Sequence, residues 1–378
     1  MAKTIYADNA ATTKLDRAAF EAMIPWLTED YGNASQPYSF ARKPKKALTE
    51  AREMIAECIG ALPDEVFFTS GGTESDNWAL KSFGLETNVR KAITSEIEHH
   101  AVLNASKGAI RLPVDSEGIV SPKTLEDVLT SDNTTVPSGS ATLVSVMLVN
   151  NEIGTIEPVK ELAAIAHAHA ALFHTDAVQA VGHIPIDVKD LCVDMLSASA
   201  HKFNGPKGIG FLYIRKGVQL RPFMDGGAQE SQRRAGTENI ASIVGMAIAL
   251  KKSCDEMQNA AKKLRTMENI FLDTLRRAGV DFIRNGAEHR VPGNVNISVR
   301  GVSGEMLLHR LDLKGISIST GSACDSVNTQ VSHVVQAIGV PHEYAKGTIR
   351  VSFGRDNVME DAAEIAEAIV NILRNLKI

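Results

Sequence analysis

Short apolar runs that end in small or polar residues recur along the chain. Residues 65–70 form a β-rich run, residues 91–95 a strand-like stretch, and residues 141–149 a nearly continuous apolar run typical of a buried strand. Residues 172–176 are expected to form another short apolar strand, and residues 348–355 alternate as a strand does. Ligands of α/β proteins bind where such strands end, so the residues that follow each run are candidates for the functional site.

Helical patterns lie between and after these strands. Residues 74–80 continue the first strand as a helix, and residues 51–59 are amphipathic. A longer helix is expected over residues 257–275, ended by Gly279, and it should lead into a small domain. The pattern predicts an α/β protein with a large domain over residues 13–253 and a small domain made of residues 1–12 and 254–378. We expect residues 130–140 to be a surface loop, because strands lie on both sides.

Lys202 follows a histidine, between a small-residue strand end and the turn at Gly205-Pro206. A lysine on a rigid strand end can be desolvated enough to act as a Schiff-base nucleophile toward a carbonyl cofactor such as pyridoxal phosphate (PLP). A surface lysine in a turn is the alternative. PLP also needs an acid for its pyridine nitrogen and a cradle for its phosphate, so the rest of the chain decides between the two.

Both of these groups have candidates. Asp176 ends an apolar strand and can pair with a pyridinium, although it could equally be a helix N-cap. The turn at Gly71-Gly72-Thr73 joins a strand to a helix, the geometry that points backbone N–H groups and a hydroxyl at a phosphate. A plain strand-to-helix turn remains the alternative there. The chain has neither a Walker loop at this turn nor the G-x-G-x-x-G spacing of a dinucleotide fold, which lowers the case for NAD.

Two further strands deliver polar residues to the same edge. The run 141–149 is followed by Asn150-Asn151-Glu152, and His99 and His100 follow the stretch 91–95. One of the two histidines can lie flat on an aromatic ring. A metal site is the poorer interpretation, because adjacent residues on an extended chain point to opposite faces.

The four cysteines show no C-x-x-C spacing, so neither a disulfide framework nor a zinc knuckle is indicated. Cys58 lies in an amphipathic stretch, Cys192 beside an apolar strand and Cys254 at the start of a helix, and all three are interpreted as packing residues. Cys324 lies in a small, polar stretch that indicates a mobile loop, where a thiol can reach a bound substrate and withdraw. An incidental loop cysteine is the alternative.

Length and charge narrow the class of protein. The chain has 378 residues, which favours two domains, and its net charge of -5 comes from dispersed charges, so neither nucleic acid nor an anionic membrane is an evident partner. No basic-then-apolar signal opens the chain, and no run approaches the roughly 18 apolar residues of a membrane span. We expect a cytoplasmic enzyme.

Arg350 lies on the expected strand 348–355. It can hold an amino-acid carboxylate with two hydrogen bonds, or form a surface ion pair.

Several segments, in one order from the N-terminus almost to the end, carry a resemblance to a known family. They are residues 7–13, 32–33, 69–77, 149–154, 174–177, 201–202, 205–208, 234–237 and 321–324. In these segments the chain resembles PLP-dependent cysteine desulfurases of the NifS/IscS type. The resemblance implies an α/β, fold-type I transferase of the class V aminotransferase kind, with a mostly parallel seven-stranded sheet, a smaller α/β domain and a homodimeric assembly.

The resemblance also assigns the cofactor site. Lys202 would hold PLP, Asp176 would pair with the pyridine nitrogen, and His99 would stack on the ring and serve in catalysis. Asn151 and Gln179 would contact the 3-oxygen of the ring.

The phosphate and the substrate have their own implied residues. Next to the Gly72 turn, Thr73, Ser199 and His201 would bind the phosphate, and Thr237 would reach in from the other subunit. Asn33 and Arg350 would hold the carboxylate of L-cysteine. Cys324 would attack the sulfur of the cofactor-bound cysteine, which yields alanine and an enzyme persulfide for delivery to an acceptor protein such as an iron-sulfur scaffold.

The chain departs from the family pattern at three places. Tyr38 stands where many members have histidine, and Ser231-Gln232 replaces an Arg-Gly pair near the dimer loop. Asp325 follows the proposed nucleophile, where threonine is frequent; its charge would disfavour the thiolate and could change which acceptor docks.

Three functions therefore compete. A desulfurase needs both Lys202 and Cys324, whereas another PLP-dependent aminotransferase or β-lyase, such as one acting on selenocysteine or cysteine sulfinate, needs only Lys202. A non-catalytic α/β binding protein needs neither residue.

Overall fold

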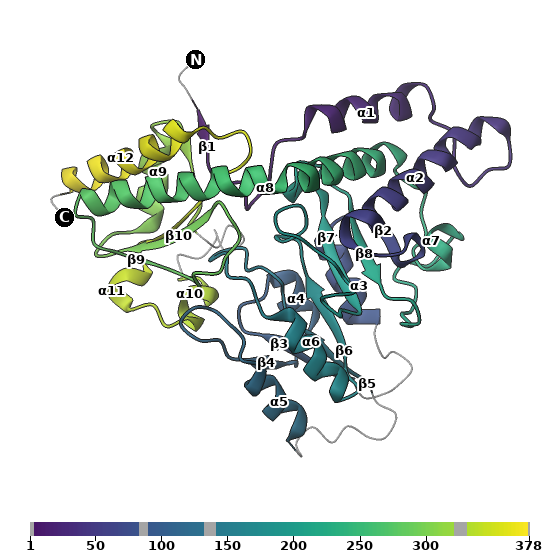
Figure 1. The fold of residues 1–378 in the computed structure, drawn as a ribbon, viewed down its shortest axis with the longest axis horizontal. Helices are drawn as coiled ribbons and strands as arrows, with labels where there is room; N and C mark the ends of the chain where they lie inside the picture. The colour runs from purple at the N-terminus through teal and green to yellow at the C-terminus, as the bar shows by residue number, and fades with distance from the viewer. Residues whose placement is uncertain (1–3, 83–89, 132–140, 321–330, 377–378) are drawn as a thin grey trace.

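The computed structural model describes residues 4–82, 90–131, 141–320 and 331–376, which form two groups of strands connected by one long helix (Figure 1). The strands are β1 Ile5–Tyr6, β2 Val66–Thr69, β3 Arg90–Ser95, β4 Ile110–Leu112, β5 Ala141–Ser145, β6 Leu172–Asp176, β7 Met195–Ser199, β8 Gly210–Ile214, β9 Phe282–Arg284, β10 Asn294–Val299, β11 Ile316–Ser317 and β12 Thr348–Ser352. The α-helices are α1 Arg17–Thr28, α2 Arg42–Ile59, α3 Gly72–Ser82, α4 His100–Ala105, α5 Pro122–Thr130, α6 Val159–Ala168, α7 Gln229–Gln232, α8 Ile240–Arg277, α9 Gly304–Asp312, α10 His333–Ala337, α11 His342–Ala345 and α12 Met359–Asn375. Short 3₁₀ turns cover Ser39–Ala41, Pro63–Glu65 and Ala200–Lys202.

The larger sheet has seven strands in the order β2-β8-β7-β6-β5-β3-β4. Strand β8 runs antiparallel to both of its neighbours, and the other described pairings are parallel. The predicted mostly parallel seven-stranded sheet is therefore confirmed. The carboxyl ends of β3, β5, β6 and β7 meet at one edge, which is where parallel sheets place their ligands.

Helices cover both faces of this sheet because its strands are apolar on both sides. Phe68 packs with residues of α2, α6 and the first part of α8, whereas its neighbour Phe67 packs on the opposite face against Trp78 of α3 and Val102 of α4. Successive strand residues point to opposite faces, so one short run serves two cores.

Strand β5 is shorter than the apolar run 141–149 predicts. It ends at Ser145, although residues 146–149 stay buried. The N–H of Met147 donates to the carboxylate of Glu98 (2.9 Å) and not to a neighbouring strand. Apolar sequence shows burial, but it could not show that a buried glutamate would take one backbone donor out of the ladder.

The smaller sheet has the antiparallel order β12-β10-β9, and β1 pairs with β11 in a separate parallel ribbon. Ile5 and Ala7 of the N-terminal segment pack in the same core as α12 and the second part of α8. The assignment of residues 1–12 and 254–378 to one domain stays a prediction.

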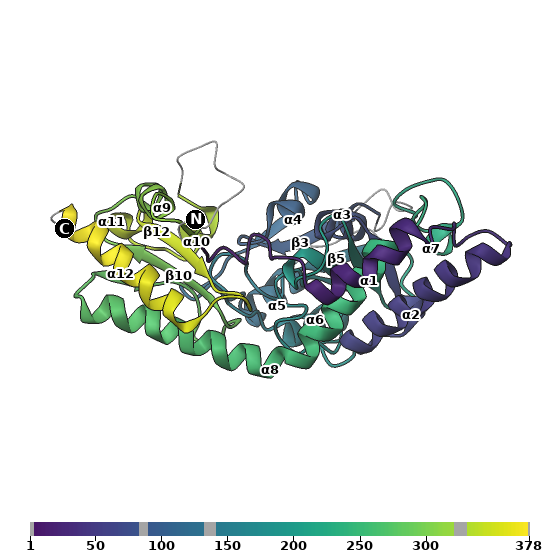
Figure 2. The same ribbon diagram turned by 90° about the horizontal axis from the view of Figure 1, so that it is seen from above.

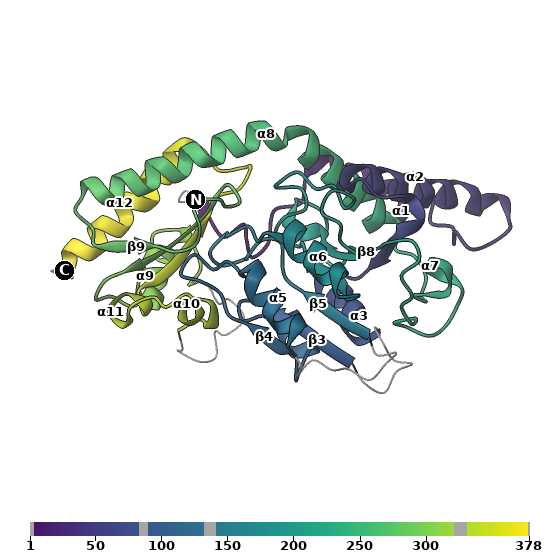
Figure 3. The ribbon, with the colours of Figure 1, turned by 60° about the horizontal axis from the view of Figure 1, so that its bottom comes forward.

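Helix α8 is 38 residues long and passes along both sheets (Figures 2 and 3). It contains the predicted helix 257–275 and ends before Gly279, which has a φ of 73° as expected of a helix-ending glycine. It begins earlier than predicted, at Ile240, where the side chain of Asn239 accepts the N–H of Ser242 (3.2 Å). The predicted boundary at 253/254 thus falls inside a continuous helix. Within the described ranges, no helix has the length and apolar character that a bilayer span requires.

Candidate active site

A cavity of about 320 Å³ lies at the carboxyl edge of the seven-stranded sheet. Ten of the residues predicted for the site line it: Gly72, Thr73, His99, Asn151, Asp176, Gln179, Ser199, His201, Lys202 and Arg350. They come from strand ends, from the start of α3, from loops after β3 and β5, and from β12 of the smaller sheet. Residues that are far apart in the sequence therefore come together in one cavity.

Lys202 lies in the 3₁₀ turn that follows β7. Its Nζ donates to the carbonyl oxygens of Ala10 and Ala11, both at 2.7 Å. The turn is tight because Gly205 donates its N–H to Ala200 O (2.8 Å), and a Cβ at Gly205 would lie 2.9 Å from that oxygen. The lysine is thus held into the cavity and is not a surface residue.

Asp176 ends β6 and is almost fully buried. One of its oxygens accepts the N–H of Val178 (2.9 Å), in a turn that no α-helix continues, so the helix N-cap interpretation does not hold. Burial raises the pKa of Asp176, while His99 and Lys202 act in the opposite direction. The group is a buried acid that lies next to two bases.

A second acid, Asp76, lines the cavity and was not predicted. It is 1% exposed, and its nearest basic atom is Nε2 of His174 at 3.7 Å. Burial lowers the pKa of His174 to about 3, so this ring is neutral and bonds to Ser145 (2.8 Å) and Ser197 (3.0 Å).

Burial, with Asp176 as the next cause, raises the pKa of Asp76 well above its usual value. Asp76 is thus a second buried acid of the cavity, and its surroundings favour the protonated form. A sequence signal existed: Asp76 is three residues after Thr73 on one helix, and residues so spaced share a face.

The glycine turn leads directly into α3, which begins at Gly72. Gly71 has a φ of 150°, and a Cβ on Gly72 would lie 2.5 Å from Val178. Both positions thus need glycine, which brings the helix start against the cavity.

His201 lies in the turn after β7. Burial lowers the pKa of His201 to about 4, so its ring is neutral. Its Nδ1 bonds to the Thr12 hydroxyl (3.1 Å), which leaves Nε2 for another contact.

His99 caps α4, accepting the N–H of Ala101 on Nδ1 (3.1 Å). His100 also lines the cavity, with its ring 6.3 Å from that of His99 and 5.1 Å from that of His333. The expectation that the two neighbours point apart was wrong, because a helix begins between them. The described residues contain no group of three His, Cys, Asp or Glu side chains that could hold a metal.

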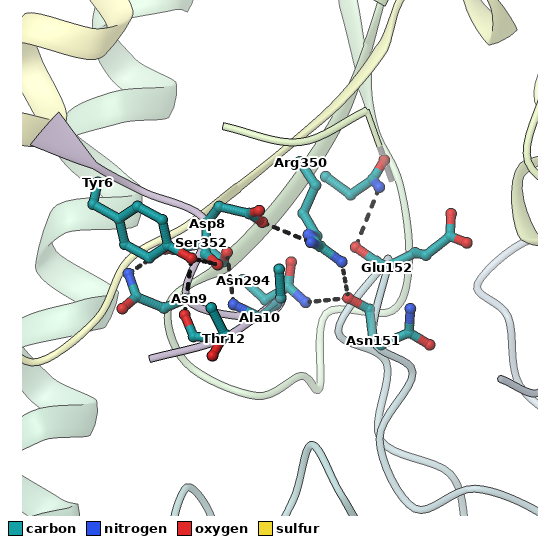
Figure 4. A network of polar contacts seen from close by, with 12 residues as sticks. Tyr6, Asp8, Asn9, Ala10, Thr12, Asn151, Glu152, Asn294, Arg350 and Ser352 are labelled. Atoms are coloured by element: carbon teal, nitrogen blue, oxygen red, sulfur yellow. Dashed lines mark hydrogen bonds and ion pairs between the residues drawn. The ribbon is translucent and has the colours of Figure 1, made fainter. Parts of the chain in front are cut away.

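Arg350 reaches the cavity from β12 and is 2% exposed (Figure 4). It donates to Asp8 (2.7 Å) and to the carbonyl of Asn151 (2.9 Å). Its ion pair is therefore buried and not at the surface. The loop of Asp8 is itself held by the Tyr6 hydroxyl, which donates to the carbonyls of Asp8 (3.0 Å) and Thr12 (2.9 Å).

Two predicted residues do not line this cavity. Asn33 lies between α1 and α2 and accepts the N–H of Ser35 (2.9 Å). Thr237 is exposed in the loop before α8. The two loops meet where Ser35 contacts Glu238 (3.4 Å).

The cysteines divide differently from the prediction. Cys58 and Cys254 pack against the core of the larger sheet, as predicted. Cys192 does not: it is exposed, with a φ of 56°, because it sits in a turn before β7. Cys324 lies outside the described residues.

Known proteins are similar to this chain over nearly its whole length. The sequence profile of the Aminotransferase class-V family matches residues 5–365. The cysteine desulfurase IscS of Dictyoglomus turgidum is 46% identical, over 100% of this chain and 97% of the relative. That of Methanosarcina thermophila is 44% identical, over 99% and 93%.

Solved structures agree. A NifS-like protein superposes with a TM-score of 0.89 at 37% identity, over 99% of this chain and 100% of its own. SspA, solved in complex with cysteine, gives a TM-score of 0.80 at 32% identity, over 94% and 100%. With its lysine, buried acid and glycine turn in one cavity, the chain belongs to the class-V aminotransferase family, among the PLP-dependent cysteine desulfurases.

Proposed function

We propose that this chain removes sulfur from L-cysteine, releases L-alanine and retains the sulfur as a persulfide on Cys324. One observation carries the proposal: a single cavity holds the amine of Lys202, the carboxyl of Asp176 and the guanidinium of Arg350. An amine for the cofactor, an acid for its ring and a cation for an amino-acid carboxylate are the groups this reaction needs.

The residues present fit PLP. Asp176 is a buried carboxyl that accepts the N–H of Val178, and a protonated ring nitrogen would favour its charged form. The start of α3 at Gly72 and Thr73, with Ser199 and the neutral His201, supplies uncharged donors for a phosphate. His99 would stack on the ring, and Asn151 and Gln179 would contact its 3-oxygen. Bound PLP supplies a ring that withdraws electrons from the α-carbon of the substrate.

Arg350 would bind the substrate carboxylate by exchanging one partner for another. In the described structure its Nη2 is taken by Asp8, and a bidentate carboxylate would replace that contact. Lys202 is the amine positioned to move a proton at the α-carbon once its own nitrogen is released.

Cys324 would supply the thiolate. It attacks the substrate sulfur, the carbon–sulfur bond breaks, and the carbon keeps the electron pair and takes a proton to become alanine. The residues that flank the segment 321–330 support this role. Ser319 exchanges backbone hydrogen bonds with Arg350 (2.7 and 3.1 Å), and Ser332 donates to Glu152 (2.7 Å), which lines the cavity.

The assembly follows from Thr237. It is exposed on its own subunit, so we infer that it serves the phosphate site of a second copy in a homodimer. Asn33 lies beside the same loop, and we propose that it reaches the substrate across the same boundary. We further propose cytoplasmic delivery of the sulfur to an acceptor protein such as an iron-sulfur scaffold.

Turnover of L-cysteine by purified protein, with alanine and sulfide measured together, tests the function. Cys324→Ser should keep the cofactor and its spectral response to cysteine but lose persulfide and sulfide. Mass spectrometry after a cysteine pulse should place the added sulfur on Cys324. Sulfur on Cys58, Cys192 or Cys254, or full turnover in Cys324→Ser, would instead favour an aminotransferase or another β-lyase.

Lys202→Ala tests the cofactor assignment separately. Borohydride should fix PLP to the wild-type protein and not to the variant. A cofactor that is still fixed in Lys202→Ala would assign the bond to another lysine.

A further inference from the structure

Among the ion pairs that hold the segment between β8 and α8, residues 215–239, two are bidentate. In the first, Arg52 of α2 forms two hydrogen bonds to Glu230 (2.6 and 2.8 Å), and Glu230 also accepts the N–H of Phe68 on β2 (2.9 Å). In the second, Arg234 forms two hydrogen bonds to Glu74 of α3 (2.9 and 3.1 Å). Bidentate pairs of this kind fix orientation as well as distance.

Glu74 connects two parts of the molecule. It directly follows Thr73, and its Oε2 also accepts the N–H of Ser70 (2.8 Å), so it braces the glycine turn from both sides. Burial would raise the pKa of Glu74, but its bonds to Arg234 and Ser70 outweigh burial and lower it. The group is therefore charged at neutral pH, and its pair with Arg234 is a full ion pair.

The backbone around the first pair is strained. Glu230, Ser231 and Gln232 have φ of 46°, 56° and 66°, which non-glycine residues avoid. Such a conformation persists only where contacts fix it, and the buried Glu230 supplies them. The path that leads to Arg234 and Thr237 is thus imposed by named side chains.

We propose that Glu74 and Arg234 are a positioning pair that ties the phosphate-binding turn of one subunit to the loop that completes the phosphate site of its partner. Thr237 is three residues beyond Arg234, so a displaced Arg234 moves it directly. This inference rests on the proposed dimer, in which Thr237 acts on the partner's site. The pair would then link the two cofactor sites of the dimer through one side-chain contact.

Mixed dimers test the direction of the effect. In one dimer, Lys202→Ala is in one subunit and Arg234→Gln in the other, so the remaining lysine site receives an unaltered Thr237 loop. In the second dimer, both changes are in the same subunit, and the remaining site receives the altered loop. Two different affinity tags isolate each mixed dimer, and the absorbance of PLP retained after dialysis is the measurement.

We expect the second dimer to bind PLP on the order of tenfold more weakly than the first, since a charge-assisted contact is lost from the loop that serves its site. The first should stay near the wild-type value per site, because Glu74 keeps its bond to Ser70. Arg284→Gln is the matched control: its pair with Glu268 is as buried, with side chains 27% and 6% exposed against 21% and 9% for Arg234 and Glu74.

Two results would overturn the inference in distinguishable ways. Equal retention in both mixed dimers, or a greater loss in the first, would reject the pair as a link between sites while leaving the dimer intact. Sedimentation of the wild-type protein as an active monomer would reject the dimer itself, and the link with it.

Discussion

The two halves of the cavity satisfy their charges in opposite ways. The half built on the seven-stranded sheet holds Asp76 and Asp176, carboxyl groups whose pKa is raised by burial. The half built on the smaller sheet holds Arg350, which already has Asp8 as its partner. In the proposed function, Asp176 of the first half would keep one partner, the ring nitrogen of the cofactor, whereas Arg350 of the second half would exchange Asp8 for each substrate carboxylate. A resident cofactor and a passing substrate thus require different electrostatic preparation.

The largest effect is expected when Asp176, in the first half, is replaced. Asp176→Asn removes the charge opposite the ring nitrogen and should lower kcat by about 10²–10³-fold, the range seen when one preorganised electrostatic group is lost. Asp76→Asn mimics the protonated acid and should stay within about threefold of the wild type. Steady-state kinetics of the two variants make the comparison. Similar losses in both would mean that Asp76 shares the charge.

In the second half, a substitution at Asp8 removes the ion pair with Arg350. Asp8→Asn leaves Arg350 without its charged partner, so the protein should lose roughly 3 kcal/mol of unfolding free energy. The freed guanidinium should bind the substrate carboxylate more readily, with KM lower by several-fold. Denaturant unfolding and KM measured on one preparation test both effects. A raised KM would show that Asp8 orients Arg350 more than it competes with the substrate.

Glu157 is a buried acid outside the cavity, and it can be compared with the buried acids inside it. Burial raises the pKa of Glu157 to about 8, although one of its oxygens accepts the N–H of Val120 (2.9 Å). Because the folded state keeps this proton after the unfolded chain has lost it, its contribution to stability is complete below about pH 4 and is lost as pH rises to about 8.

Glu157→Gln should remove that dependence, on the order of 3–4 kcal/mol between pH 5 and pH 8. Unfolding free energies of the apoprotein at the two pH values measure it. Since Glu98 also has a pKa raised by burial to about 8, part of the wild-type dependence should remain. An unchanged slope in Glu157→Gln would place the titration elsewhere.

The smallest effect concerns the strained loop. Gln232→Gly supplies a residue that adopts a φ of 66° freely, so stability should rise by about 0.5–1 kcal/mol. Gln232→Ala is the matched control, because it removes the same side chain without relieving the backbone. Thermal unfolding compares them, and an equal change in both would assign the effect to side-chain contacts.

The sequence alone predicted the site residues that lie at or just after the ends of strands. Asp176 ends a strand and Lys202 and Gly72 each follow one, and a mostly parallel sheet brings such strand ends together. Asp76 was missed, although its helical spacing from Thr73 offered a signal. The contact between Asp8 and Arg350 spans 342 residues, and no periodicity connects positions so far apart.

The hydrophobic pattern also failed to predict where the longest of the described helices begins. Helix α8 begins 17 residues before Met257, in a segment whose small and apolar residues pack against α1 and α2 on several sides. An amphipathic pattern marks a helix with one buried face, and it fades where the helix is covered all round.

The pairing of the first residues with the last strands has a consequence for biosynthesis. Ile5 lies against Ile316, and the side chain of Asn9 donates to the carbonyl of Ser352 (2.9 Å), so neither contact exists until the ribosome has made nearly the whole protein. The seven-stranded sheet, whose last strand ends at Ile214, can assemble earlier. A nascent chain should therefore acquire its cofactor-binding half first and remain unable to hold an amino acid until translation is almost complete.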